Sequence, residues 1–401
     1  MRTIHLWLGL TSGLLVFIIA ITGCIYAFQE EIQNATQPFR FVQNQHSAFL
    51  PPSEIQKISD AALPDKHIHA VMYYDSVRAA KAIYYSLEEH YYYYVYVNQY
   101  TGEVLKVKNE YADFFRFILD GHFYLWLPDD LGQLVVASAT LVFLAMLISG
   151  IVLWWPKKLN GLKKKFTIKW QSGWRRKNYD LHSVLGFYVS WLALIAVITG
   201  LVWGFQWFRD GVFAIASGGD KYIEYYNPPS DTTSMQAFTI PAIDQVWLKM
   251  VKEYPKAESI EVHPPEDAVS AIAANANPDS YTYWKTDYRY FDQYTLEELP
   301  VDHVWNRFDE ANAAELLMRM NYDIHVGAIL GLPGKILAFL ISLTVASLPI
   351  TGVLLWLGRR KKEKHKRDKI VIVEEIASPK GLNYSNPEPC PGYSEARSSR
   401  L

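Results

Sequence analysis

Cysteine is nearly absent from this chain of 401 residues, which contains only Cys24 and Cys390. Cys24 stands near the end of the first apolar stretch, whereas Cys390 stands in the polar C-terminal tail. The two positions are expected on opposite sides of a membrane, so no disulfide framework is predicted.

Charged side chains are missing from four windows, at residues 6–28, 134–155, 183–206 and 336–357. A helix rises ~1.5 Å per residue, so each window is long enough to cross a hydrocarbon layer of ~30 Å. The sequence therefore predicts a membrane protein with four transmembrane helices. The motif ITGC, which ends at Cys24, resembles a lipoprotein cleavage box that would remove the first span. Because the apolar run continues beyond this cysteine, a retained span is favoured.

Lysine and arginine gather in residues 156–181 and in the stretch RRKKEKHKRDK after the fourth window. By the positive-inside rule both segments and the N-terminus face the cytoplasm, and the two long connections lie outside. The formal net charge of −2 hides this asymmetry and gives no indication of nucleic-acid binding. The basic runs are interpreted as flanking anchors, with contact to anionic membrane lipid as a second use.

These windows divide the chain into spans and connections. Each long connection is large enough for a small folded domain. In order, the predicted parts are a first span (1–28), an outer domain with the helix before the second span (29–125), the second span (134–155), a basic cytoplasmic loop (156–181), the third span (183–206), an outer domain with the helix before the fourth span (207–332), the fourth span (336–357) and a cytoplasmic tail (358–401).

The first and third spans resemble each other at a constant spacing of 177 positions. HLWLG at residues 5–9 matches HSVLG at residues 182–186, and ITG at residues 21–23 recurs at residues 198–200. Around the second and fourth spans, SGIVLWW resembles TGVLLWL, and the pattern Arg-x3-Asp-x-His precedes both. We interpret the chain as a tandem duplication whose halves are related by a two-fold axis along the membrane normal.

The outer connections also correspond. VNQYTGEVL at residues 97–105 parallels FDQYTLEEL at residues 291–299, and each follows a tyrosine-rich alternating run that predicts a strand. Residues 52–63 and 240–254 predict short amphipathic helices. Each connection is therefore expected to form an α+β domain, with a helix packed on a small antiparallel sheet.

Four of the eleven histidines occupy matched positions beside the spans. His5 and His182 stand at the inner ends of spans one and three, whereas His122 and His325 stand just outside the outer ends of spans two and four. One such histidine is most simply an interfacial anchor, but two symmetric pairs of ionisable residues beside a bilayer indicate function. A two-fold axis brings each pair together. Facing imidazoles, with no Cys, Asp or Glu at metal-ligand spacing, favour axial ligation of haem over zinc, so two haems are expected.

Several residues near these histidines allow two interpretations. Gly9, Gly13 and Gly186 leave room on a helix face either for a flat ring or for close helix packing. Arg116 and Arg319 either pair with haem propionates or mark the membrane interface.

Two further groups have a simpler reading. Three aspartates stand two residues before a histidine and are expected to be helix N-caps rather than hydrogen-bond partners of the imidazoles; they are Asp120, Asp180 and Asp323. His67 and His69 share a strand face that could hold a metal, although surface strand residues are the simpler interpretation. His263 has no partner by spacing.

Four motifs in this order resemble the PepSY-associated transmembrane family of bacterial iron-regulated inner-membrane proteins. They are the Arg-x2-His-x3-Gly opening of the first span, the turn NQYTGEVL, the His-x3-Gly opening of the third span, and TGVLLWL before a basic tail, and the resemblance covers roughly residues 1–365. It implies periplasmic PepSY-like domains and, in the most similar members, reduction of ferric siderophores by haem b on membrane histidines. For this sequence it implies His5, His182, His122 and His325 as ligands of two haem b groups.

The resemblance has one departure, because Leu296 stands where the first outer connection has Gly102. The second PepSY-like domain is therefore expected to be degenerate at its turn.

The expected function is that of a ferric-siderophore reductase, an oxidoreductase of the bacterial inner membrane with both termini in the cytoplasm. Hard oxygen ligands hold Fe(III) far more tightly than Fe(II), so an electron delivered to the periplasm releases iron for uptake. Such a reaction needs a docking surface but no catalytic acid or base. The tyrosine-rich residues 90–97 offer such a surface, although strand tyrosines more often form core and cross-strand pairs.

No Gly-rich nucleotide loop precedes a helix in the two basic segments. The electron donor is therefore expected to be separate, either a quinol in the bilayer or a cytoplasmic flavoprotein. The alternative function is that of a non-enzymatic PepSY-type membrane protein that binds or regulates peptidases or envelope ligands, with the histidines as interfacial residues.

Overall fold

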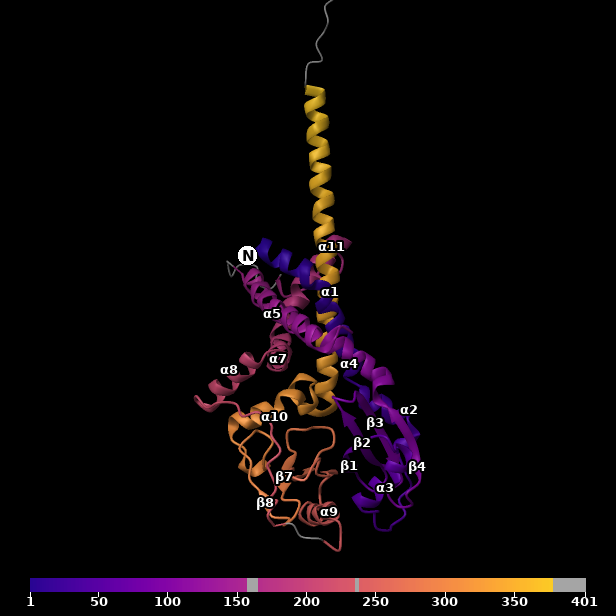
Figure 1. Ribbon diagram of the computed structural model, residues 1–401. Helices are drawn as coiled ribbons and strands as arrows, with labels where there is room; N and C mark the ends of the chain where they lie inside the picture. The colour runs from indigo at the N-terminus through magenta and orange to yellow at the C-terminus, as the bar shows by residue number, and fades with distance from the viewer. Residues whose placement is uncertain (157–164, 235–237, 378–401) are drawn as a thin grey trace, which may run out of the picture. The chain divides into compact units, whose positions relative to one another are not determined.

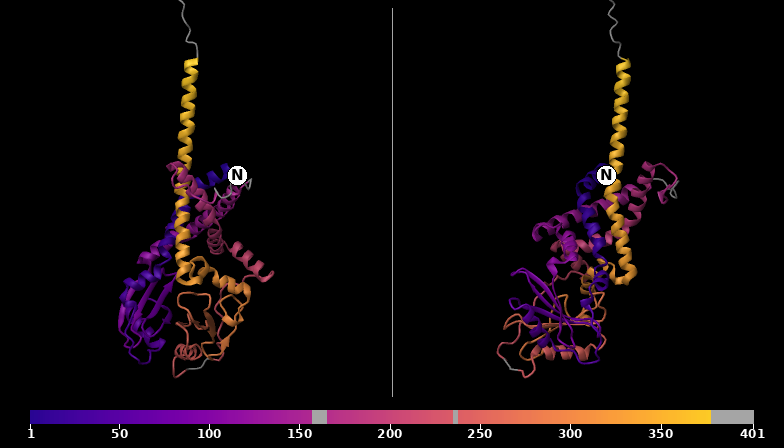
Figure 2. Two further views of the ribbon diagram at one scale, coloured as in Figure 1. Left: turned by 180° about the vertical axis from the view of Figure 1, so that it is seen from behind. Right: turned by 90° about the vertical axis from the view of Figure 1, so that its right-hand side faces the viewer.

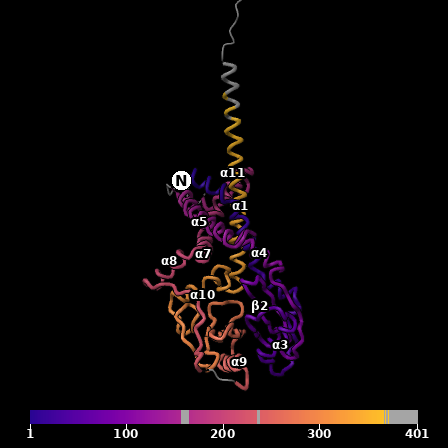
Figure 3. Tube along the Cα trace, in the orientation of Figure 1, coloured from indigo at the N-terminus to yellow at the C-terminus, as the bar shows by residue number. Residues whose placement is uncertain are grey.

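The computed structural model describes residues 1–156, 165–234 and 238–377 (Figures 1 and 3). Cys390 and the basic residues within 157–164 lie outside the described residues. The chain divides into one unit of Met1–Val353 and a second unit of Leu354–Leu401. The fold and the site below belong to the first unit. The described part of the second unit is the end of one long helix.

The described chain contains two series of elements, each with helices first, then four strands, then helices again (Figure 1). The first series consists of α1 (Arg2–Tyr26), α2 (Gln29–Thr36), η1 (Pro38–Arg40), α3 (Pro52–Ala62), β1 (Ile68–Tyr73), β2 (Ala80–Ser86), β3 (Tyr91–Val97), β4 (Val104–Asn109), η2 (Glu110–Ala112), α4 (Phe114–Tyr124) and α5 (Asp129–Trp154). The second series consists of α6 (Trp174–Asp180), η4 (Leu181–Leu185), α7 (Gly186–Gly204), α8 (Gln206–Ser217), α9 (Ala242–Glu253), β5 (Ser259–His263), β6 (Ile272–Asn277), β7 (Asp287–Phe291), β8 (Glu298–Leu299), η5 (Phe308–Glu310), α10 (Ala313–His325), η6 (Ala328–Leu330) and α11 (Gly331–Ala377). The descent of the two series from one duplicated unit stays a prediction.

Four helical segments among the described residues are long and apolar enough to cross a membrane, as the uncharged windows predict. They are Arg2–Tyr26, Asp129–Trp154, Trp174–Gly204 and Ala328–His365. Their shared core contains Val16 and Ala20 of α1, Leu147 of α5, Ala193 of α7 and Val345 of α11. A bundle with small and branched side chains at its centre lets the helices approach closely.

The third span begins earlier than the uncharged window, because α6, η4 and α7 form one continuous segment from Trp174. Asp180, inside the predicted loop, is only 2% exposed and accepts a bond of 2.9 Å from Arg176, one turn earlier. The segment η4 is a single π-helical turn. Such turns widen an α-helix locally and are frequent at functional sites. His182 lies within it.

All eight described strands form one antiparallel sheet with the order β4-β3-β2-β1-β5-β6-β7-β8. The seam between the two series is the β1–β5 pair, in which Val71 lies opposite Val262. The sequence predicts an α+β domain in each connection, and in the structure these two regions share this sheet (Figure 2).

Helices α3 and α9 cover one face of the sheet, in the positions predicted for the two amphipathic helices. Ile55 of α3 and Met250 of α9 are fully buried against strand residues that include Val71. The two helices are also joined, because the backbone N–H and the hydroxyl of Ser53 donate to the buried Asp244 carboxylate at 2.8 and 2.6 Å. The core is therefore continuous across the seam.

Tyrosines occupy both faces of this sheet. Tyr84 and Tyr91 lie in the core beneath the helices. On the other face, the rings of Tyr92, Tyr94 and Tyr96 form a row of edge-to-face contacts with centroids 5.2 and 6.2 Å apart. The packing interpretation of the tyrosine-rich strand is confirmed.

The expectation of a degenerate second turn is wrong. Leu296 adopts a left-handed φ of 60°, close to the φ of 75° at Gly102. The hydrogen bonds also correspond, since Gly102 N–H donates to the Asn98 carbonyl and Leu296 N–H donates to the Asp292 carbonyl, both at 2.9 Å. Asp292 further accepts from the backbone at Tyr294 and Thr295. These bonds hold a leucine in a conformation that glycine adopts without cost.

Candidate functional site

The four matched histidines lie at helix ends beside the bundle. His5 is in the first turns of α1 and His182 is in the π-helical turn before α7. His122 lies in the last turn of α4, and His325 is the last residue of α10. Each of these rings is held by a helix other than its own.

The Nδ1 atom of every one of these histidines has a hydrogen-bond partner. His5 is bonded to the hydroxyl of Ser149 on α5 at 2.8 Å, and His182 to the hydroxyl of Thr351 on α11 at 2.9 Å. The corresponding bonds of the other pair join His325 to the hydroxyl of Thr199 on α7 at 2.9 Å, and His122 to the carbonyl of Ile19 on α1 at 2.8 Å, with Thr22 at 3.3 Å.

The proton on each ring can be assigned from these partners. A carbonyl such as that of Ile19 only accepts, so the His122 Nδ1 must carry the hydrogen. The hydroxyls of Ser149, Thr351 and Thr199 each donate their single hydrogen to a carbonyl of their own helix, at distances between 2.8 and 3.1 Å. They too are left as acceptors. His122 is therefore an Nδ1–H tautomer, in which Nε2 carries the lone pair that binds a metal, and the carbonyl bonds of the three hydroxyls favour the same tautomer for His5, His182 and His325.

Glycine follows the hydroxyl residue in each case and leaves space for the imidazole. A Cβ atom would lie 3.4 Å from His5 Cε1 if placed at Gly150, and 3.4 Å from His182 Cε1 if placed at Gly352. It would lie 3.1 Å from His122 Cε1 at Gly23 and 3.5 Å from His325 Cε1 at Gly200. Each histidine thus lies against a Ser/Thr-Gly dipeptide, which supplies the room for the ring and, for His5, His182 and His325, also the acceptor.

The rings of His122 and His325 come together, as predicted for the outer pair, whereas the pairing of His5 with His182 and the two-fold axis stay predictions. Their centroids are 6.1 Å apart and their planes are inclined by 67°. Two imidazoles that share one metal ion through nitrogen–metal bonds of about 2 Å have a comparable separation of their ring centres. The residues at this position therefore fit axial ligation by two imidazoles.

The family model described as the PepSY-associated TM region matches residues 2–359 of this sequence. The chain belongs to the PepSY-associated TM family. No curated protein matches it.

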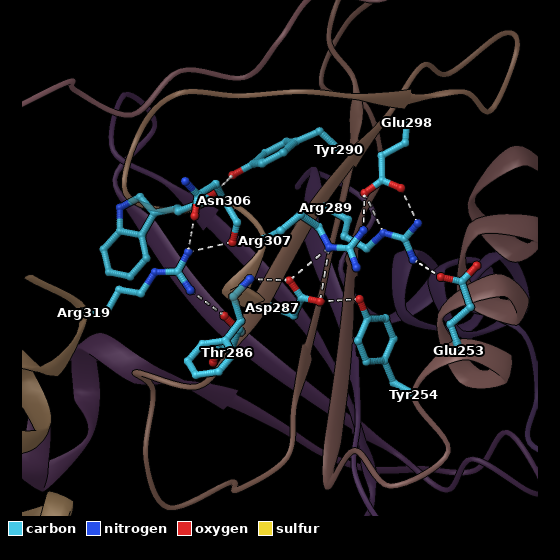
Figure 4. Close-up of polar contacts among 12 residues, drawn as sticks. Glu253, Tyr254, Thr286, Asp287, Arg289, Tyr290, Glu298, Asn306, Arg307 and Arg319 are labelled. Atoms are coloured by element: carbon cyan, nitrogen blue, oxygen red, sulfur yellow. Dashed lines mark hydrogen bonds and ion pairs between the residues drawn. The ribbon is translucent and has the colours of Figure 1, made fainter. Parts of the chain in front are cut away.

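Arg319 of this PepSY-associated TM protein does not reach toward a ligand site. It is 1% exposed, and its guanidinium donates to the carbonyls of Thr286, Val304 and Asn306 at 2.7 to 3.1 Å (Figure 4). Arg116 pairs instead with Asp120, one turn later, at 2.8 Å. Arg319 therefore joins the neighbouring loops to α10. The hydrogen bonds of both arginines go to these protein groups and not to an imidazole.

The interpretation of three aspartates as N-caps is wrong. The N-cap of α4 is Asp113, whose carboxylate accepts from Phe115 N–H, and the N-cap of α10 is Asn312, which forms a capping box with Glu315. Asp120 and Asp323 are consequently inside these helices, and Asp180 is the last residue of α6. Asp323 accepts from the backbone N–H groups of Tyr283 and Trp284 at 2.9 to 3.2 Å, which fastens the loop after β6 to α10.

The glycines named from the sequence serve helix packing. A Cβ at Gly9 would lie 3.1 Å from Met146, at Gly13 3.4 Å from Pro349 and at Gly186 3.7 Å from Leu348. The glycines that face the histidines belong instead to the partner helices. Their signal was present in the recurring ITG and in the paired SG and TG of spans two and four.

The remaining histidines do not assemble a metal site in the described part of the chain. There, no group of three or more His, Cys, Asp or Glu side chains is placed to hold a metal ion. His69 of β1 contacts His263 of β5 with centroids 4.9 Å apart, a contact across the seam that sequence spacing does not reveal. Burial lowers the pKa of His69, and the neighbouring His263 lowers it further, so a neutral ring is favoured there.

Proposed function

We propose that this PepSY-associated TM protein is a di-haem b reductase that delivers electrons to ferric siderophores at the periplasmic face of the bacterial inner membrane. The observation that carries the proposal is the common state of His5, His182, His122 and His325. Each ring forms a hydrogen bond through Nδ1, which leaves Nε2 available to bind a metal, and each ring lies against a glycine.

His122 and His325 are the proposed ligands of the outer haem, and His5 and His182 those of the inner haem. When held by two histidines, haem b would supply one-electron transfer and would leave the iron no free position for oxygen or substrate. The protein residues keep the rings in one tautomer and one orientation, which is the usual role of a hydrogen-bond partner behind a ligating histidine.

The proposed topology follows the distribution of basic residues. Both termini and the loop between the second and third spans are assigned to the cytoplasm, where positive charge is retained and can contact anionic lipid. The eight-stranded sheet is then periplasmic, on the same side as His122 and His325. The repeated elements are assigned to a tandem duplication with a two-fold axis between the halves.

The proposed substrate class follows from coordination chemistry. Siderophores bind Fe(III) through hard oxygen atoms, and one added electron weakens this binding by converting the metal to Fe(II). The electron donor is assigned to a separate molecule, a quinol in the bilayer or a cytoplasmic flavoprotein.

A pyridine haemochrome spectrum of the purified protein tests the cofactor. We expect two haem b groups per chain, and one fewer after replacement of His122 or His325 by alanine. The matched control is His365→Ala, which changes an exposed histidine of α11. Protein that is produced with ample haem and still contains none would exclude the proposal in favour of a non-enzymatic role.

The pairing and the reaction need separate measurements. His5→Ala and His182→Ala should remove the same spectral component, whereas His122→Ala and His325→Ala remove the other. Protein reduced anaerobically and mixed with a ferric siderophore should become reoxidised. Stable reduced haem in the presence of ferric hydroxamates and ferric catecholates alike would contradict the assignment as a reductase.

A further inference from the structure

Two buried asparagines stand one helical turn before the histidines of the second half. Asn178 precedes His182 by four residues and is 3% exposed, and Asn321 precedes His325 by four residues and is 5% exposed. Residues four apart lie on the same face of a helix. Each asparagine therefore points to the same neighbouring helix as the histidine that follows it.

Each asparagine binds the threonine that also holds its histidine. Asn178 Nδ2 donates to the Thr351 carbonyl at 3.1 Å, while the Thr351 hydroxyl is bonded to His182. Asn321 Nδ2 donates to the Thr199 carbonyl at 3.1 Å, while the Thr199 hydroxyl is bonded to His325. In each case one threonine forms two hydrogen bonds with the same neighbouring helical segment, through its carbonyl to the asparagine and through its hydroxyl to the histidine one turn later.

Two attachment points define an orientation that one point leaves adjustable. With only the imidazole bond, a helix can slide or rotate and still keep Nδ1 near the hydroxyl oxygen. The amide bond to the carbonyl of the same threonine removes this freedom. The direction in which Nε2 points is then set by the position of the helix as well as by the ring torsions.

The buried side chain of Asn178 carries a cost in stability. Its Oδ1 atom is buried and has no hydrogen-bond partner among the described residues. A buried polar atom without a partner loses its hydration with nothing in return, so an apolar side chain would suit the packing better. The contribution of this side chain is therefore the hydrogen bond from its Nδ2 to the Thr351 carbonyl, which packing alone does not require.

The equivalent positions in the described first half hold no side-chain donor. Met1 stands four residues before His5, and Ile118 stands four residues before His122. Neither side chain can donate a hydrogen bond. In the repeat alignment, Thr22 corresponds to Thr199, so a donor at position 118 would face the carbonyl of Thr22.

We propose that Asn178 and Asn321 are positioning residues that make His182 and His325 the more rigid of the two histidines that would hold each haem. His5 and His122, which lack the second bond, are the more easily displaced ligands. This inference rests on the proposed function, because it concerns how the histidines hold the two haems.

The test uses full-length Asn178→Leu and Asn321→Leu, which keep the branched shape of the side chain but remove the amide donor. Ferric low-temperature electron paramagnetic resonance and a redox titration report on each haem separately. We expect Asn321→Leu to shift the signal and the midpoint potential of the outer haem alone, and Asn178→Leu those of the inner haem alone. Haem transfer from the altered site to an apoprotein scavenger should become about 10-fold to 100-fold more extensive.

A gain of the same bond provides the matched control. Ile118→Asn adds the missing donor beside His122 and should slow haem loss from the outer site without changing the inner one. If a leucine variant does not accumulate as folded protein, Ile118→Asn still tests the proposal. Asn321→Ser is a second substitute: it retains a donor on a shorter side chain, and its outer haem should be disturbed less than that of Asn321→Leu.

The outcomes separate this inference from the function on which it rests. Wild-type protein without haem removes the proposed function. Wild-type protein with two haems, together with leucine variants whose signals and potentials are unchanged, overturns the positioning role. Equal disturbance of both haems by each single variant would also overturn it, since a general loss of packing gives that result.

Discussion

The His122 ring is held by a backbone carbonyl, that of Ile19, whereas the His325 ring is held mainly by a side chain, that of Thr199. The two histidines therefore differ in their response to mutation. Thr199→Val keeps the shape of the side chain but removes the acceptor at 2.9 Å, so haem binding at the outer site should weaken by about tenfold. The haemochrome content after dialysis measures this effect.

Thr22→Val is the matched control for that substitution. The Thr22 hydroxyl is 3.3 Å from His122 Nδ1, and the Ile19 carbonyl remains in place at 2.8 Å. We expect wild-type haem content from this variant. Equal losses from both valine variants would show that the hydroxyl groups do not hold the rings.

Gly23→Ala should disturb the outer site through steric contact. The added Cβ would lie 3.1 Å from Cε1 of His122, a ring that the Ile19 carbonyl already fixes. The ring has to shift by a few tenths of an ångström, so the outer spectral component should move or be lost. Gly186→Ala, whose Cβ meets Leu348 at an ordinary 3.7 Å, should leave both components intact. A wild-type spectrum from Gly23→Ala would contradict the close approach of the His122 ring to Gly23.

Arg319→Met should impair folding more than haem binding. The substitution leaves the carbonyls of Thr286, Val304 and Asn306 without their donor, at about 1–3 kcal/mol for each buried group. The thermal midpoint of the detergent-solubilised protein should fall strongly. Arg116→Met, which breaks a partly exposed pair with Asp120, should change stability by less than about 1 kcal/mol. A folded Arg319→Met protein that has lost only haem would restore the propionate interpretation.

Acid should weaken the edge of the sheet at Glu298. Burial raises the pKa of this carboxyl, but the hydrogen bonds and charge of Arg289, with Arg307 nearby, outweigh burial and hold it below the ordinary value of 4.5 (Figure 4). A pKa that is lowered by folding means that ionised Glu298 stabilises the protein above 4.5, and this contribution is lost as the pH falls below that value.

Glu298→Gln tests this pH dependence. The variant should be less stable than the wild type at neutral pH, and the difference between them should shrink as the pH is lowered. Thermal midpoints of the wild type and of Glu298→Gln, measured from neutral to acidic pH, report this difference. A difference that does not change with pH would exclude the charge of Glu298 as its cause.

Periodicity and charge predicted the parts of the fold that depend on local sequence. The uncharged windows located the spans, and the apolar spacing in residues 52–63 and 240–254 located α3 and α9. The prediction of the helix N-caps from nearby residues was wrong. The N-caps of α4 and α10 are Asp113 and Asn312, and both helices continue through the aspartates that were expected to cap them.

The partners of the histidines could not be read from local sequence. Ser149 is 144 positions from His5, and Thr351 is 169 positions from His182. Alignment of the two halves identified which histidines correspond, but it does not show which helix lies behind each ring. The turn at Leu296 was misjudged for a related reason, since the bonds accepted by Asp292 hold the backbone despite the side chain.

The β1–β5 seam restricts how the halves of this protein can move. Backbone hydrogen bonds across Val71 and Val262 join them, so neither half can swing away from the other as an independent lid without breaking the sheet. Cutting the chain into halves would leave β1 and β5 as open edge strands, which readily pair with other chains. A protein built from only one such half would therefore have to protect that edge in another way, for instance by pairing it with a second copy of itself.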